Sequence, residues 1–505
     1  MVNKANLTRA AENDILMGRA VPYVSRMKYW SNPSVKKSVC LFCSLGCGVA
    51  FRCDGDQAKE LDYDKENPVC NGALCPRGHY NIELLNHPGR LMTPMIGKRA
   101  VAWDEALSFI LQELKQFKPE ELGIVLSSNA SNEDAYMAAK LARSLGTKNI
   151  SAAGDPADLE AWLGSKYEVP GAQLSSIEEI DNSEALLIVG DILVRSPVLS
   201  QRINKVKYGK RGNKVIVIDP NKTHTAWFAT THLKNRPGTE ALVLAAMVLG
   251  KEADLARISE LTGLPAQAIE KAASDFSSAP TGTLIFSPGA NKERNDLIGY
   301  FAKILAARSG GKKQITFYSF GNTLGVNSIL DREVEGHAAY PELIKKIESA
   351  EIKSMIMLGE IILGNKIRHL KFTAKSRFFA DESPYETEVQ LPLASQIDGG
   401  GTYILADGRQ AAPVPVTPQA GAKTNAEIVS LIMNTEFDRD KLQAEAAASL
   451  AKGPVQAKID QREAVKEVMA IKAGPDRPAE NITHFGNNDL VKRFFWYRLK
   501  AGELS

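Results

Sequence analysis

Six cysteines, all between residues 40 and 75, are the side chains of this 505-residue chain whose grouping most clearly suggests chemistry. Cys40, Cys43 and Cys47 form a Cys-x2-Cys-x3-Cys run, and Cys75 follows after 27 intervening residues. Cysteines that only fill a hydrophobic core would be scattered, whereas a metal site needs them together. Four thiolates with this spacing suit a [4Fe–4S] cluster, in which each iron binds one sulfur.

Zinc and disulfides are the alternative uses of these cysteines. A structural zinc site usually contains two Cys-x2-Cys pairs, but the second half of this motif offers Cys70 and Cys75, separated by four residues. Disulfides suit secreted chains, and the first residues show no signal peptide. The spacing therefore favours a cluster. It leaves Cys70 open as a replacement for Cys75, and it gives Cys53 no role.

Composition places the chain among ordinary globular proteins. Its 44% hydrophobic and 24% charged residues are typical of that class, and the length allows roughly two to four domains. A net charge of +3 gives no basis for nucleic-acid binding, which requires a strongly basic face. No apolar run reaches the length of a membrane span, so we expect no direct membrane insertion. The expected location is the cytoplasm.

Short apolar runs alternate with amphipathic stretches along most of the chain. The runs that predict buried parallel strands are 121–129, 185–191, 214–220, 281–289, 314–321 and 352–360. Helical patterns lie between or beside them, for example at 101–117, 131–146 and 238–250. This alternation predicts an α/β fold with doubly wound parallel sheets. Ligands bind at the carboxyl ends of such strands, and these ends are rich in Gly, Asn, Ser and Asp. This indicates a large polar ligand, or the ancestral site of one.

Several short motifs accompany the cysteines in a fixed order. They are Cys75-Pro76-Arg77-Gly78, Arg90-Leu91, Trp103-Asp104-Glu105-Ala106-Leu107, Ser131-Asn132-Glu133, Gly190-Asp191, Asp219-Pro220, Arg236-Pro237-Gly238-Thr239-Glu240 and Gly400-Gly401-Thr402. Through this series the chain resembles the molybdopterin oxidoreductase family from about residue 38 to 435. In type it is most similar to members like the large iron–sulfur subunit of respiratory complex I. The resemblance implies a [4Fe–4S] cluster on Cys40, Cys43, Cys47 and Cys75, with Cys75 preferred over Cys70.

The patterns and the resemblance together divide the chain. An N-terminal arm is expected over 1–37, and a small iron–sulfur domain over 38–100. Residues 101–150 and 315–435 are expected to form one discontinuous α/β domain, with a second α/β domain inserted at 151–314. A helical interaction tail is expected over 436–505. Its aromatic run 494–497 favours an anchor into another subunit, with packing on the chain's own core as the alternative. The C-terminal β-barrel of the full-length family enzymes is not expected.

Enzymes of this family hold molybdenum or tungsten on a molybdopterin guanine dinucleotide. The resemblance assigns the contacts of such a cofactor to Arg77, Gly190, Asp191, Asp219 and Thr239 of this chain. Arg77 stands at the position that bridges the cluster and the pterin in the family. The plainer interpretation is a cation that offsets the negative charge of the cluster, and both roles are compatible.

The loop that carries the metal ligand in catalytic relatives departs from the family pattern. Here it covers 146–162, contains no cysteine, and offers only Asp155 and Ser151 as oxygen ligands. Asp155 precedes a proline at the start of a predicted helix, which predicts a helix N-cap in place of a metal ligand. Asn221 and Glu240 stand where the family favours arginine and aspartate.

The expected function is electron transfer through one [4Fe–4S] cluster within a multi-subunit redox complex, on a scaffold without a catalytic metal. The implied partners are redox subunits that carry iron–sulfur clusters or flavin, or that are linked to NAD(P)H or ferredoxin. A catalytic molybdenum or tungsten subunit, similar to formate or formylmethanofuran dehydrogenases, is the first alternative. A structural subunit is the second. No catalytic residue is assigned.

Overall fold

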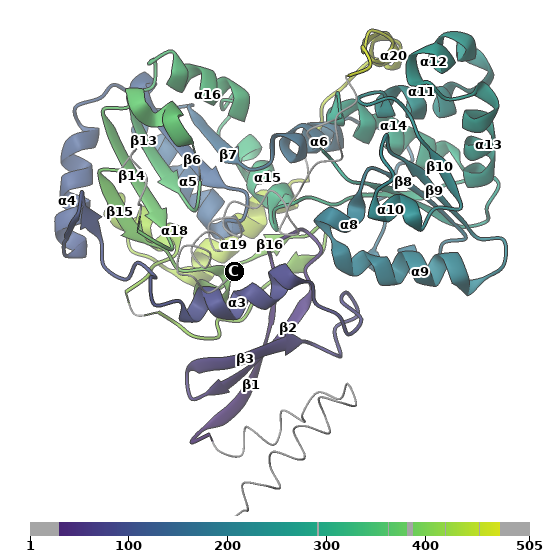
Figure 1. Cartoon of the computed structure of the whole chain (residues 1–505). Coiled ribbons are helices and arrows are strands. Elements are labelled where there is room, and N and C mark those ends of the chain that lie inside the picture. Colours follow the sequence, from purple (N-terminus) through teal and green to yellow (C-terminus); the bar gives the residue numbers. More distant parts are fainter. Residues whose placement is uncertain are drawn as a thin grey trace, which may run out of the picture.

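A computed structural model describes residues 30–289, 292–361, 363–380, 387–419, 421–453 and 455–474. Most of the expected N-terminal arm and the aromatic run 494–497 lie outside these residues. Three sheets make up most of the strand content: a small antiparallel one and two larger ones (Figure 1). Among the described residues no helix has both the length and the apolar character that crossing a membrane requires.

The small sheet contains three antiparallel strands, which are β1 (Pro33–Val39), β2 (Gly48–Asp54) and β3 (Gln57–Tyr63). Val39 pairs with Gly48, so the loop 40–47 joins the adjacent ends of β1 and β2. After β3 the chain passes Cys75 and enters helix α3 (Pro76–Asn86), for which Cys75 is the N-cap residue. All the expected cluster ligands are therefore placed at one end of this sheet.

The largest sheet has the strand order β5-β4-β15-β14-β13-β6-β7, with five parallel strands from β15 to β7. Its strands are β4 (Met95–Ile96), β5 (Arg99–Ala100), β6 (Leu122–Ser127), β7 (Ile150–Ala153), β13 (Ser354–Leu358), β14 (Phe372–Arg377) and β15 (Val389–Pro392). Alternate residues of β6 point to opposite cores. Ile124 and Leu126 pack with α4 (Trp103–Leu114), α5 (Asn132–Leu145) and α18 (Asn425–Ile432), and Val125 packs with α16 (Tyr340–Glu348).

The other large sheet is parallel throughout, in the order β10-β9-β8-β11-β12. Its strands are β8 (Ala185–Val189), β9 (Lys214–Ile218), β10 (Thr231–Leu233), β11 (Gly282–Phe286) and β12 (Lys313–Thr316). One face is covered by α7 (Ile177–Asp181), α8 (Ile192–Arg195) and α9 (Ser200–Gly209), and the other by α11 (Glu240–Leu249), α13 (Ala266–Ser277) and α14 (Asn295–Arg308). Helices on both faces of parallel sheets confirm the predicted α/β class.

Strand pairing shifts the expected limits of the inserted domain by a few residues. β7 continues to Ala153 within the seven-stranded sheet, although the insertion was expected to begin at 151. β12 pairs with β11 through Thr316, although the insertion was expected to end at 314. Both differences have the same cause, because hydrogen bonding to the neighbouring strand decides to which sheet a boundary residue belongs.

Helix α6 (Pro156–Lys166) connects the two large sheets and packs closely against α14. A Cβ atom on buried Gly164 would lie 2.2 Å from the backbone oxygen of Asp296, so only glycine allows this approach. Two further helices, α19 (Arg439–Ala451) and α20 (Gln461–Met469), lie in the expected tail. The first packs against α5 and the second buries Ala464 and Val468 in the core beside α11 (Figure 1).

The close approach of α6 and α14 predicts opposite effects for two helical glycines. Gly164→Ala should lower the free energy of unfolding by about 1–3 kcal/mol, because the methyl group overpacks the contact. Gly209→Ala is the matched control, since its Cβ would meet nothing within 4 Å, and it should be neutral or stabilising by about 0.5 kcal/mol. Denaturant unfolding of both variants measures the difference, and equal effects would contradict the described contact.

Candidate iron–sulfur and cofactor sites

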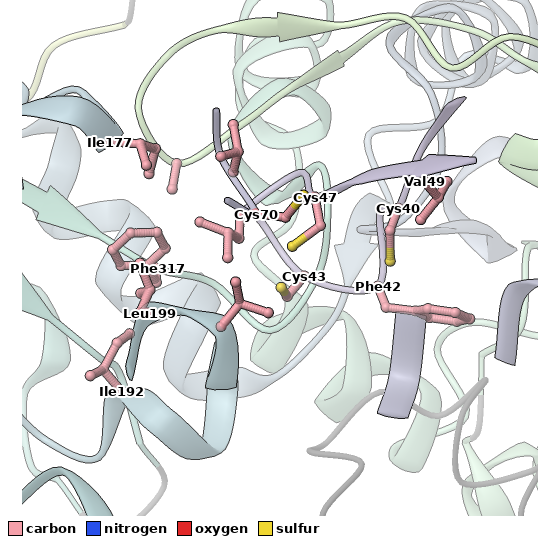
Figure 2. Close-up of a cluster of buried hydrophobic side chains, with 14 of the residues drawn as sticks. Cys40, Phe42, Cys43, Cys47, Val49, Cys70, Ile177, Ile192, Leu199 and Phe317 are labelled. Atoms are coloured by element: carbon pink, nitrogen blue, oxygen red, sulfur yellow. The ribbon is translucent and has the colours of Figure 1, made fainter. Parts of the chain in front are cut away.

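Four thiols come together where the small sheet meets helix α3. Cys40, Cys43 and Cys47 lie on the loop 40–47, and Cys75 lies immediately before the helix. The loop is closed by the Cys40 N–H, which donates to the Cys47 carbonyl at 2.8 Å. The first three thiols are buried and Cys75 is partly exposed. Figure 2 shows the three on one loop of chain, with Cys70 close to Cys47.

Electrostatics show that these thiols are neighbours. Burial, followed by the charge of Cys75, raises the pKa of the Cys40 thiol to about 12. Burial also raises the pKa of Cys47, with further contributions from Cys43, Cys40 and Cys75. Without a metal the Cys40 and Cys47 thiols would therefore stay protonated. Positively charged irons reverse this preference, because they stabilise the thiolate form.

The remaining two cysteines have backbone partners. The Cys70 thiol is fully buried, and its sulfur lies 3.6 Å from the Gly48 carbonyl and 3.5 Å from the Asp64 carbonyl. Cys53 faces the Phe51 carbonyl at 3.9 Å. Carbonyl oxygens are acceptors, so these sulfurs act as weak S–H donors. These contacts account for Cys70 and Cys53 without a metal, and Cys75 remains the predicted fourth cluster ligand.

No group of three or more His, Cys, Asp or Glu side chains in the described part of the chain is arranged to hold a metal ion. A cubane cluster requires a wider arrangement than a single ion, because each thiolate binds a different iron.

Two distant segments brace the cysteine loop. Gly46 has a φ of 73° and leaves room for the Leu405 side chain, which a Cβ would approach to 2.4 Å. Ser44 donates its N–H to the Tyr318 carbonyl at 3.1 Å and accepts from the Ala406 N–H at 2.9 Å through its own carbonyl. The cysteine loop is therefore held in place by Tyr318, which follows the five-stranded sheet, and by residues 405 and 406.

Arg77 lies beside these thiols and is only 1% exposed. One terminal nitrogen donates to the Arg195 carbonyl, but Nε and the other terminal nitrogen have no hydrogen-bond partner among the described residues. Its positive charge opposes the effect of burial on the pKa of Cys43. Leaving buried N–H groups unpaired costs free energy. This arrangement suits a site that accepts an anionic or polar ligand next to the cluster.

The expected pterin contacts lie at the carboxyl ends of the five-stranded sheet. Gly190 has a φ of 90°, and its missing Cβ leaves space near the Lys292 ammonium group. Asp191 accepts a hydrogen bond from Thr225 at 2.5 Å, and Asp219 accepts from the Asn221 N–H at 2.8 Å. Thr239 donates to the Arg236 carbonyl at 2.7 Å. These residues lie together at the carboxyl end of the sheet.

Glu240 is a buried carboxyl group at this end of the five-stranded sheet. It is fully buried, and among the described residues its carboxylate oxygens have only weak contacts, with the Asn235 side chain and with the N–H of Glu240 itself. Burial raises the pKa of this carboxyl to about 7, although the nearby charge of Lys292 opposes the shift. Sequence reasoning missed Lys292. A lysine shortly after the Ser-Pro-Gly turn that ends β11 was the available signal, because such loops meet ligands.

The seven-stranded sheet has a pocket at its corresponding end. Ser127, Asn129, Gly359 and Glu360 are among its lining residues, and they come from the expected strand ends 127–129 and 358–360. The orphaned groups of Arg77 and Glu240, together with this pocket, fit the contacts that a large polar cofactor requires.

The loop between β7 and α6 does not fit a metal centre, because both carboxylate oxygens of its candidate ligand Asp155 are bonded within the protein. Asp155 is the N-cap of α6, because its Oδ1 accepts from the Ala157 N–H at 3.0 Å. Its Oδ2 accepts from Arg195 at 3.1 Å. The same guanidinium bonds Asp158 at 2.9 Å, and the other oxygen of Asp158 accepts from the Ser319 N–H at 2.6 Å. Sequence reasoning missed Arg195 and Asp158, which no local pattern links to Asp155.

Separate substitution of Cys75 and Cys70 tests which of them is the fourth cluster ligand. Cys75→Ser should lose most of the iron and acid-labile sulfide, because one iron would lack its thiolate. Cys70→Ser is the matched control and should keep both, since a hydroxyl can donate to the same backbone carbonyls. Iron and sulfide analysis of the two purified variants measures the effect. Loss of iron from Cys70→Ser with retention in Cys75→Ser would contradict the assignment.

Glu240→Gln tests the buried carboxylate in the cofactor-free chain. The folded-state pKa of about 7 lies above the ordinary value of 4.5, so ionisation of Glu240 destabilises the fold increasingly from about pH 4.5 to pH 7. The variant should be more stable than the wild type by roughly 3 kcal/mol at pH 8, and similar to it near pH 4.5. Denaturant unfolding across this range measures the gain. Glu252→Gln, at an exposed position, is the control, and a pH-independent difference for Glu240→Gln would contradict the assignment.

Comparison with known families gives two matches. The model of the molybdopterin oxidoreductase family matches residues 90–367, and the model of the molybdopterin oxidoreductase Fe4S4 domain matches residues 33–87. The F420-dependent formate dehydrogenase 2 subunit alpha of Methanococcus maripaludis is 29% identical over 292 residues, which cover 51% of this chain and 43% of that protein. The NADPH-Fe(3+) oxidoreductase subunit alpha of Geobacter sulfurreducens is 25% identical over 508 residues, which cover 84% of this chain and 58% of that protein.

The chain thus spans about half the length of these two relatives. Among solved structures, acetylene hydratase from Pelobacter acetylenicus has a TM-score of 0.62 at 18% identity, covering 83% of this chain and 72% of that one. This similarity shows a shared fold. The long family match, the Fe4S4 domain and the fold agree, and the chain belongs to the molybdopterin oxidoreductase family.

Proposed function

We propose that the chain is an electron-transfer subunit that carries one [4Fe–4S] cluster on Cys40, Cys43, Cys47 and Cys75. The grouping of these thiols between a small sheet and α3 supports the proposal, as does the match to an Fe4S4 domain. A cluster bound there would supply one-electron transfer. Three of the thiols are buried, which shields them from water, while partly exposed Cys75 offers an edge for a redox partner.

The proposal that the chain lacks a catalytic metal rests on the hydrogen bonds of Asp155. Both of its carboxylate oxygens are used within the protein, by the helix cap and by Arg195. Ser151, the other expected oxygen ligand, is buried and directs its hydroxyl toward the Ala152 carbonyl at 3.4 Å. A metal at this position would therefore have to do without a protein ligand or disrupt a buried ion pair, which is unfavourable.

A multi-subunit setting follows from the relatives. Two of them are alpha subunits by name, one of an F420-dependent formate dehydrogenase and one of an NADPH-Fe(3+) oxidoreductase. The second aligns with 84% of this chain. We infer that this chain works beside other redox subunits, with iron–sulfur clusters or flavin and with links to NAD(P)H or ferredoxin.

A catalytic molybdenum or tungsten subunit is the second candidate, and three observations favour it. Arg77 and Glu240 keep buried polar atoms that a guanine dinucleotide cofactor could pair with. A cavity of about 560 Å³ lies beside the start of α6, where Ser151, Pro156 and Ala157 are among its lining residues. Several curated relatives are named formate dehydrogenase subunits or nitrate reductases.

Metal analysis of the native complex separates these candidates. The transfer subunit should contain iron and sulfide in equal amounts, with neither molybdenum nor tungsten, and its cluster should be reduced by the partner subunits. About one molybdenum or tungsten per chain, with extractable pterin, would establish the catalytic candidate instead. A complex assembled with Cys43→Ser is the control, because its iron content should fall. A cluster that the partners cannot reduce would favour a structural role.

A further inference from the structure

We propose that Ser196 is a positioning residue that raises the reduction potential of the cluster through a hydrogen bond from its hydroxyl to the sulfur of Cys43. This inference rests on the proposed function, because it requires a cluster on the four cysteines. It concerns a residue 153 positions away from Cys43, on the inserted α/β unit. Nothing in the local sequence around the cysteines points to it.

The contact is direct and buried. The Ser196 Oγ lies 3.7 Å from the Cys43 Sγ, a distance that suits hydrogen bonding to sulfur. Ser196 is only 1% exposed, so water does not compete for the sulfur. In the described part of the chain this is the one hydrogen bond that the hydroxyl makes. Among the described residues the hydroxyl thus bonds the cluster ligand and no other acceptor.

The backbone around Ser196 is held on both sides. Its N–H donates to the Ile192 carbonyl at 2.8 Å, and its carbonyl accepts from the Leu199 N–H at 3.0 Å. The preceding residue, Arg195, is anchored by Asp155 and Asp158 through its guanidinium group and accepts from Arg77 through its carbonyl. Because all these contacts are buried, the hydroxyl keeps its direction when the charge of the cluster changes.

The direction of the effect follows from charge. Reduction adds one electron to the cluster, and part of that negative charge resides on the cysteine sulfurs. A hydrogen bond donated to a sulfur is stronger when the sulfur is more negative, so it stabilises the reduced state more than the oxidised state. Burial increases this difference, since electrostatic interactions are stronger where the dielectric constant is low. Removal of the donor should therefore lower the potential.

Ser44 provides a matched control on the same loop. It follows Cys43 directly and is 2% exposed. Its hydroxyl donates to the Tyr318 carbonyl at 3.1 Å and accepts from the Tyr318 N–H at 2.7 Å. Ser44→Ala thus removes a buried hydroxyl next to a ligand without removing a sulfur contact. It should reduce stability while leaving the potential near that of the wild type.

The experiment is a redox titration of the complete complex, monitored by electron paramagnetic resonance of the reduced cluster. Ser196→Ala should shift the midpoint potential to more negative values at unchanged iron and sulfide content. Ser196→Thr keeps the hydroxyl and should stay closer to the wild type. An unshifted potential in Ser196→Ala, or an equal shift in Ser44→Ala, would overturn the inference.

A second variant covers the case in which Ser196→Ala fails to retain its cluster. Ser196→Cys places a weak S–H donor at the same position, so its potential should lie below that of the wild type by a smaller amount. A wild-type value in this variant would overturn the inference. Wild-type complex without iron and sulfide would instead overturn the proposed function, so the two failures are distinguishable.

Discussion

The buried ion pairs of Arg195 hold together the parts of the molecule that matter for its chemistry. The guanidinium joins Asp155 and Asp158 of the α6 segment, and Ser319 beyond β12 bonds the same group. Its backbone carbonyl contacts Arg77, and the next residue contacts Cys43. Removing one partner of such a group leaves an uncompensated buried charge, which typically costs about 3–5 kcal/mol. The geometry around the thiols and the crossover between the two large sheets therefore depend on one side chain.

Buried polar groups in this protein fall into two sets with different meanings. Asp155 and Asp158 are paired with Arg195 and with backbone N–H groups. Arg77 is not, since two of its nitrogens have no partner among the described residues, and the Glu240 carboxylate is held there only by weak contacts. Such unpaired groups are rare in folded proteins. The scaffold thus combines unpaired polar atoms on one side with a fully bonded loop before α6 on the other.

Features coded by short stretches could be predicted from the sequence, and features made by distant residues could not. The cysteine spacing, the strand ends and the α/β class belong to the first kind, as does the cap formed by Asp155 ahead of Pro156. Arg195, Lys292 and Ser196 belong to the second kind. Their roles depend on sheet order and on contacts across tens to hundreds of residues. The sheets to which β7 and β12 belong are also of the second kind, because strand pairing is non-local.

The bracing of the cysteine loop has a consequence for the order of biogenesis. Ser44 bonds residue 318 and residue 406, and Gly46 meets the side chain of Leu405. These contacts close very long loops, which form late because their closure loses much chain entropy. While the chain emerges from the ribosome, the three cysteines at 40–47 are made first but cannot be enclosed until residue 406 has followed. The cysteine loop therefore lacks this bracing until most of the chain has been made.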